Sequence, residues 1–232
     1  DYVEELMKDL VFAMRALRRA PAFAAAALLT LALGIGSATA IFSVAYGVLL
    51  RPLPYPDPDR LVDITVNLSG VGVAYGSLSA PEYMDLARGT RSFSSVGSWA
   101  ANTRTLGGEG RPERVITASA TTSLFNALGT RTVVGRTFTP EEDLPGAAPV
   151  ILLGNDLWRR RFGADPSIVG RTVDVDGVAR TVVGVLPPGV RVGGADAFTP
   201  IGLDPARLPR PGAHYLRGVG RLRPGVTLEQ GR

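Results

Sequence analysis

Residues able to carry out acid–base, nucleophilic or metal chemistry are scarce in this chain of 232 residues, which has one histidine, His214, and no cysteine. A Ser-His-Asp arrangement needs a histidine beside the nucleophile, and no G-x-S-x-G elbow is present. We therefore interpret His214 as a structural or surface residue. A zinc site needs several His, Cys or carboxylate ligands, which this composition does not supply.

Two pairs of nearby carboxylates lie at a helix end and in a linker, where acidic residues commonly have no catalytic role. Glu141 and Glu142 follow Thr139 and a proline, the pattern of a helix cap. Asp57 and Asp59 lie in a proline-rich stretch and are interpreted as solvated charges. The sequence therefore predicts no catalytic pair, no metal site and no enzyme.

Nucleotide-binding patterns are also missing. Gly34-Ile35-Gly36 lacks the third glycine of a dinucleotide fingerprint, and no Walker A motif is present, so we expect no cofactor. The charge run Arg159-Arg160-Arg161 could contact lipid headgroups or a partner, and a solvated helix face is the simpler interpretation. The net charge of +4 is spread without a basic stripe interleaved with aromatics, so we expect no nucleic-acid partner.

A long apolar run begins near the N-terminus. No charged residue lies between Arg19 and Arg51, and residues 23–50 exceed the roughly 20 apolar residues that span a bilayer. We assign residues 21–50 to a transmembrane helix. A cleaved signal peptide, with Ala38-Thr39-Ala40 as its site, is an alternative, although the apolar run continues past that site. A buried core helix is a second alternative.

The flanks of this run predict its orientation. Basic residues are more numerous before it than after it, which places the N-terminus in the cytoplasm and the main domain outside. Residues 1–20 carry apolar side chains at helical spacing and are predicted to form an amphipathic cytoplasmic segment. Residues 51–60 contain four alternating prolines and predict an extended, stiff connector.

Small residues recur along the apolar run at a spacing that lets a second helix approach closely. We expect this stripe to pack against further transmembrane helices, although small residues are also simply common in membrane spans. The helix-packing candidates are Ala32, Gly36, Ala40, Ser43 and Gly47.

Residues 61–232 predict an α+β domain of short strands and short helices. A helix is expected from the cap Ser79 to about Arg88, and others at residues 122–128 and 155–162. The region 68–76 is predicted to be a loop. Thr227 opens a helix with only a few residues after it, so we expect the domain to continue beyond Arg232. Strands are predicted at residues 61–67, 96–106, 113–120, 150–153, 172–175, 178–186 and 215–222.

Several blocks of the sequence carry a resemblance to known proteins: residues 9–23, 29–36, 40–44, 49–62, 135–138, 157–163, 168–171 and 182–187. The first three blocks are similar to the N-terminus of MacB/FtsX-type ABC transporter permeases, and the block at residues 49–62 is similar to their duplicated orphan branch. The later blocks resemble the MacB-like periplasmic core domain.

This resemblance implies a transmembrane helix that leads into a mixed α/β periplasmic core domain with a β-rich subdomain. It implies a non-catalytic permease subunit for export or transmembrane coupling in the bacterial inner membrane. The expected partners are membrane lipid, further helices of the same permease, a separate ABC ATPase and a periplasmic protein. A membrane-anchored periplasmic adaptor without transport activity is the alternative.

Overall fold

The structure, a computed structural model, describes residues 4–5, 7–8, 12, 15, 18–47, 54–68, 70, 72–108, 110–207 and 213–231. The chain divides into two compact units, Asp1–Leu53 and Pro54–Arg232. Each unit is described by itself. Most of the predicted amphipathic segment at residues 1–20 lies outside the described residues, as do residues 48–53.

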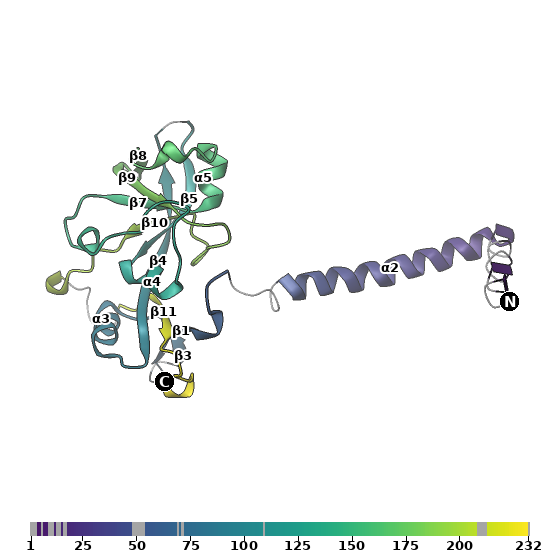
Figure 1. Cartoon of the computed structure of the whole chain (residues 1–232), viewed down its shortest axis with the longest axis horizontal. Coiled ribbons are helices and arrows are strands. Elements are labelled where there is room, and N and C mark those ends of the chain that lie inside the picture. Colours follow the sequence, from purple (N-terminus) through teal and green to yellow (C-terminus); the bar gives the residue numbers. More distant parts are fainter. Residues whose placement is uncertain are drawn as a thin grey trace. The chain divides into compact units, whose positions relative to one another are not determined.

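The first unit contains one long helix, α2 (Pro21–Ala45), drawn as the long coil in Figure 1. Pro21 stands in its first turn, where a proline costs no hydrogen bond. Its 25 residues extend about 37 Å at about 1.5 Å per residue, enough to cross a hydrocarbon core of about 30 Å. Residues 21–44 of it are the one candidate membrane span in the described part of the chain.

The second unit is built on a large sheet whose strands follow the order β1-β11-β4-β5-β10-β7-β9-β6, with β8 pairing with both β4 and β9. Because β8 bridges these two strands, β4, β5, β10, β7, β9 and β8 form a closed ring. The ring strands are β4 (Phe93–Leu106), β5 (Glu113–Ala120), β7 (Val150–Leu153), β8 (Thr172–Val175), β9 (Val178–Val185) and β10 (Ala197–Pro200). This ring is the β-rich part that the resemblance implied.

The inside of the ring is an apolar core to which every ring strand contributes. Leu106, Val115, Ile151, Val173 and Val182 belong to it, together with Ala197. Helix α5 (Asn155–Phe162) adds Leu157 and Trp158, and the short helix η5 (Pro166–Ile168) adds Ile168. Figure 1 shows α5 at the same end of the domain as β8 and β9.

The remaining strands lie outside the ring. β4 extends past the ring and pairs with β11 (Arg217–Leu222), which pairs in turn with β1 (Leu61–Ile64). β6 (Val134–Gly135) is the edge strand beside β9, and β2 (Val66–Leu68) and β3 (Val73–Gly76) form a separate hairpin. Helix α3 (Ala80–Gly89) lies with these strands over a third core that includes Tyr83 and Phe93.

Helix α4 (Thr122–Leu128) lies against β4 at the centre of the domain. Its close approach depends on Gly97, since a Cβ there would meet the backbone of Leu124. The helix inserts Leu124 and Phe125 into the largest core, where Phe125 packs edge to face on Phe138 and on Phe198. These contacts hold α4 on the sheet.

The predicted local elements are largely confirmed. Ser79 and Glu82 form a capping box at the start of α3, and Thr139 and Glu142 form another at η4 (Pro140–Asp143). Gly129 ends α4 and Gly163 ends α5 in the left-handed conformation. Three further short helices are η2 (Pro58–Arg60), η6 (Pro205–Arg207) and η7 (Glu229–Gly231).

Some predictions were wrong in detail. The single strand at residues 61–67 is divided by residue 65 into β1 and β2, which belong to different sheets. Part of the predicted loop at 68–76 is strand β3, because pairing with β2 outweighs its glycines. The strand predicted from residue 215 begins at Arg217. Strand β10 was not predicted from the sequence; it pairs with both β5 and β7 and so lies inside the sheet.

Candidate functional site: the arginine clasp

The connector that follows the membrane helix is docked on the domain. Pro54–Arg60 belong to the same compact unit as the sheet, where they form bends and the helix η2 rather than an extended rod. Tyr55 packs on the largest core, and burial raises the pKa of its phenol, while a backbone hydrogen bond at Arg191 opposes this. Asp57 adopts a left-handed backbone, φ 45°, which turns the chain.

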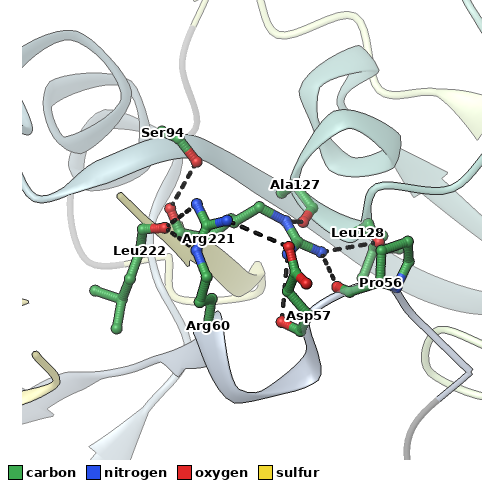
Figure 2. A network of polar contacts seen from close by, with 8 residues as sticks. All are labelled: Pro56, Asp57, Arg60, Ser94, Ala127, Leu128, Arg221 and Leu222. Carbon is green, nitrogen blue, oxygen red and sulfur yellow. Dashed lines mark hydrogen bonds and ion pairs between the residues drawn. The ribbon is translucent and has the colours of Figure 1, made fainter. Parts of the chain in front are cut away.

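A single guanidinium, that of Arg221 on β11, holds this connector. Its Nη2 donates to the carbonyl oxygen of Pro56 at 2.8 Å and its Nη1 to that of Asp57 at 3.3 Å. The same side chain donates from Nε to the carbonyl of Ala127 at 2.7 Å and from Nη2 to that of Leu128 at 3.1 Å. Figure 2 shows the guanidinium between these two pairs of carbonyls. One side chain therefore joins the connector, α4 and the sheet.

The connector also donates hydrogen bonds to the sheet through its own arginine, Arg60. Arg60 donates from Nε and Nη2 to the carbonyl oxygen of Leu222, at 2.9 and 2.6 Å. The carboxylate of Asp57 lies 3.4 Å from Arg60, and the hydroxyl of Ser94 donates to the carbonyl of Arg221 (Figure 2). We call this reciprocal arrangement the arginine clasp, defined by Pro56, Asp57, Arg60, Ala127, Leu128, Arg221 and Leu222.

The electrostatics of the clasp follow from its burial. The Arg221 residue is only 8% exposed. Burial, followed by the positive charge of Arg60, lowers the pKa of Arg221, and the Asp57 carboxylate partly opposes this. The carbonyls at the end of α4 carry the negative end of the helix dipole, which favours a cation there. The buried charge is thus compensated by carbonyl oxygens rather than by a tight ion pair.

Arg221 was not among the residues predicted from the sequence to have a role. The only local signal is an arginine inside a strand whose other residues from 218 to 222 are all buried. A buried arginine needs acceptors, but the sequence does not say which. The partners lie far away in the chain, 94 positions from Ala127 and 165 from Pro56.

The helix-packing candidates lie on α2 or just beyond it. Ala32, Gly36, Ala40 and Ser43 fall within an arc of about 80° on an ideal helix with about 3.6 residues per turn. Gly47 follows the end of α2, in a wider helical turn. All five are exposed, and a Cβ added at Gly36 or Gly47 would meet nothing within 4 Å. No described residue of the first unit covers this face.

The other chemistry-bearing residues serve the fold. His214 lies 3.3 Å from the carboxylate of Glu82. Burial raises the pKa of Glu82, but hydrogen bonds from Ser79 and His214 outweigh it and leave that pKa lowered. Of the predicted charge run, Arg160 and Arg161 both contact Glu113 on β5, at 2.6 and 3.4 Å. Among the described residues no three His, Asp or Glu side chains gather as metal ligands.

Comparison with known proteins identifies a family and several solved structures that are similar to this chain. Residues 24–232 match the family of the MacB-like periplasmic core domain. No curated protein sequence matches the chain. Three solved structures similar to this chain are 15–17% identical to it, so they report on the fold alone.

Three such structures share the fold. A domain assigned to a permease protein of Porphyromonas gingivalis has a TM-score of 0.56 at 17% identity and covers 75% of this chain and 78% of its own. The extracellular domain of the noncanonic ABC-type transporter YknZ from Gram-positive bacteria has a TM-score of 0.52 at 17% identity, over 73% and 84%. The periplasmic region of MacB from Actinobacillus actinomycetemcomitans has a TM-score of 0.56 at 15% identity, over 73% and 77%. The match over residues 24–232 and the shared fold agree with the resemblance seen in the sequence blocks, and the chain belongs to the family of MacB-like periplasmic core domains.

Proposed function

We propose that this part of a transporter permease works in export or transmembrane coupling, with no catalysis of its own. Family membership supports the assignment to a permease, and the apolar helix α2 ahead of the domain supports a place in the bacterial inner membrane. The excess of basic residues before α2 favours a cytoplasmic N-terminus and a periplasmic domain. A separate ABC ATPase would supply the energy.

The arginine clasp is the observation that supports coupling between the membrane helix and the domain. With a flexible linker, a movement of the membrane helix would change the conformation of the linker and would not displace the domain. Here the connector carbonyls of Pro56 and Asp57 are bonded to Arg221, whose strand β11 pairs along β4. A displacement that reaches Pro54–Arg60 is therefore delivered to the sheet and to α4 together.

The small-residue stripe on α2 is proposed to pack against further helices of the same permease. Gly36 and Ala40 would lie at that contact, because residues without a large side chain let two backbones approach closely. Ile41, 71% exposed, lies about 140° from Gly36 on an ideal helix of about 3.6 residues per turn and should face lipid. Cysteine crosslinking in membranes should join Gly36→Cys, but not Ile41→Cys, to a neighbouring helix. Equal crosslinking at both positions would argue against this packing.

Co-purification tests the proposed function as a whole. The full-length permease, tagged and extracted from its own membrane, is expected to retain a bound ABC ATPase whose activity changes when the permease is reconstituted in lipid. Recovery of a periplasmic protein without any ATPase would instead favour the adaptor function, in which the helix serves only as an anchor.

A further inference from the structure

A cavity of about 300 Å³ lies at the first turn of α4, between α3, η4 and the loop that follows β10. The same helix ends at its other terminus in the arginine clasp. The lining residues are Tyr83, Met84, Thr121, Thr122, Ser123, Pro140, Asp143, Ile201 and Leu203. The volume is at the lower end of the range of about 300–1,000 Å³ that small-molecule sites occupy.

One wall of the cavity is a chain of hydroxyl groups whose hydrogens are all used. Thr121 donates to the carbonyl of Ser98, and Ser123 donates to the Thr121 oxygen at 3.1 Å. The Tyr83 hydroxyl donates either to the carbonyl of Val96, at 3.5 Å, or to Ser123, at 3.0 Å, so its hydrogen is also used. Each hydroxyl oxygen has two acceptor lone pairs, so Tyr83 and Ser123 keep acceptor capacity and offer no donor.

The carboxylate in the lining is also satisfied. Asp143 accepts from the backbone N–H and the hydroxyl of Thr122 on one oxygen, at 2.9 and 3.2 Å. Its other oxygen accepts from the N–H groups of Ile201 and Gly202, at 3.1 and 3.0 Å. With four donors directed at it, Asp143 fixes the loop after β10 and does not need a cationic ligand.

The remaining lining residues of the cavity are apolar. They are Met84, Pro140, Ile201 and Leu203, and no arginine, lysine or histidine is among the lining residues. An anionic ligand would find no positive charge there, and a molecule able only to accept hydrogen bonds would find no donor on the hydroxyl wall.

From these contacts we infer that the cavity binds an uncharged, largely apolar molecule that carries a hydrogen-bond donor, such as the N–H of an aromatic heterocycle. The apolar rings would lie against Met84 and Leu203. The donor would reach the free lone pairs of Tyr83 or Ser123. Such a site does not depend on the permease function, since it is formed wholly within the second compact unit.

Indole is a suitable probe because it is uncharged, apolar and has one N–H. Equilibrium dialysis of indole against the full chain in lipid nanodiscs, corrected for empty nanodiscs, should show saturable binding at one site. Leu203→Trp should abolish it by filling the cavity, whereas Val178→Trp, at an exposed position on β9 away from the lining, should bind as the wild type does. Met84→Trp fills the same space from α3 and replaces Leu203→Trp if circular dichroism shows that variant unfolded.

The donor requirement is tested with N-methylindole, which keeps the rings and loses the N–H. One hydrogen bond is worth about 0.5–1.5 kcal/mol, so indole should bind about 2- to 12-fold more tightly. Absence of saturable indole binding, or equal binding by the Leu203→Trp and Val178→Trp variants, would overturn the site. Equal affinity for the two probes would overturn its donor selectivity.

Discussion

Arg221 donates a hydrogen bond of 2.8 Å to the carbonyl oxygen of Pro56, across 165 positions of the chain. This contact ties the connector, which leaves the membrane helix, to the strand β11 near the other end of the sequence. The same guanidinium also bonds the last turn of α4 at Ala127 and Leu128. The connector is therefore a structural part of the domain.

Loss of this arginine should destabilise the domain strongly. Arg221→Ala leaves up to four carbonyl oxygens without their donor, and each buried unsatisfied group costs about 1–3 kcal/mol, part of which water would recover. We expect a loss of about 2–4 kcal/mol in the free energy of unfolding, measured by urea denaturation of the chain in mild detergent. Arg221→Lys should recover only part of it, because an ammonium group lacks the planar fork that reaches both pairs of carbonyls.

A second arginine on the same strand provides the control. Arg217 lies 3.7 Å from Asp63, and both side chains are more than half exposed. Exposed pairs of this kind contribute about 0–1 kcal/mol. If Arg217→Ala were as destabilising as Arg221→Ala, the clasp would have no special role in holding the connector.

Replacement of Gly97 tests how firmly α4 is seated on the sheet. A methyl group at residue 97 would meet the backbone of Leu124, which no side-chain rotation can move away. Overpacking usually costs about 1–3 kcal/mol, and a clash with backbone belongs at the upper end, so Gly97→Ala should lower the melting temperature clearly. Gly89→Ala, at a position with nothing within 4 Å, should leave it nearly unchanged. Equal melting temperatures for the two variants would mean that α4 moves freely on β4.

The stability of the domain should depend on pH through Glu142. Two hydrogen bonds from Arg136, 2.7 and 2.8 Å long, lower the pKa of Glu142 most; burial opposes this, and the Thr139 N–H lowers it further. Because the folded-state pKa lies below the unfolded value of about 4.3, this stabilisation is present above about pH 4.3 and is lost as the pH falls through the folded value.

The matching measurement compares the wild type with Glu142→Gln. Their difference in unfolding free energy, about 1 kcal/mol at pH 7 for a cap with a partly exposed ion pair, should stay constant down to about pH 5 and shrink at lower pH. The free energy of unfolding of Arg136→Gln should also depend less on pH than that of the wild type. A difference that does not change between pH 7 and pH 3 would contradict the role of this carboxylate.

Short-range features of this fold could be predicted from the sequence because their causes are local. Ser79 with Glu82, and Thr139 with Glu142, each form a capping box within four residues. The Asp176-Gly177 pair marks the β8–β9 hairpin, since both residues adopt positive φ there. The helix α2 could be predicted from its own apolar run alone, without knowledge of any residue that it contacts.

Long-range features could not be predicted in the same way. The ring closes where Leu106 on β4 pairs with Val175 on β8. The sequence around either residue does not indicate which strand it pairs with. Arg221 is the same case, because its acceptors are backbone carbonyls, which every residue carries. The docked connector could not be predicted for a further reason: its prolines favour an extended chain, and the turn at Asp57 needs a left-handed backbone, which is uncommon for residues other than glycine.

The docking of the connector can be measured most directly as a distance between it and α4. Spin labels are placed at Asp59→Cys and Asn126→Cys, both exposed positions. These 232 residues contain no cysteine, so only cysteines elsewhere in the complex need replacement. In the full-length permease with its ATPase, a docked connector predicts a narrow distance distribution that is the same with and without ATP, and a broad one in Arg221→Ala. A broad or ATP-dependent distribution in the protein with Arg221 intact would contradict the coupling of the membrane helix to the domain through the clasp.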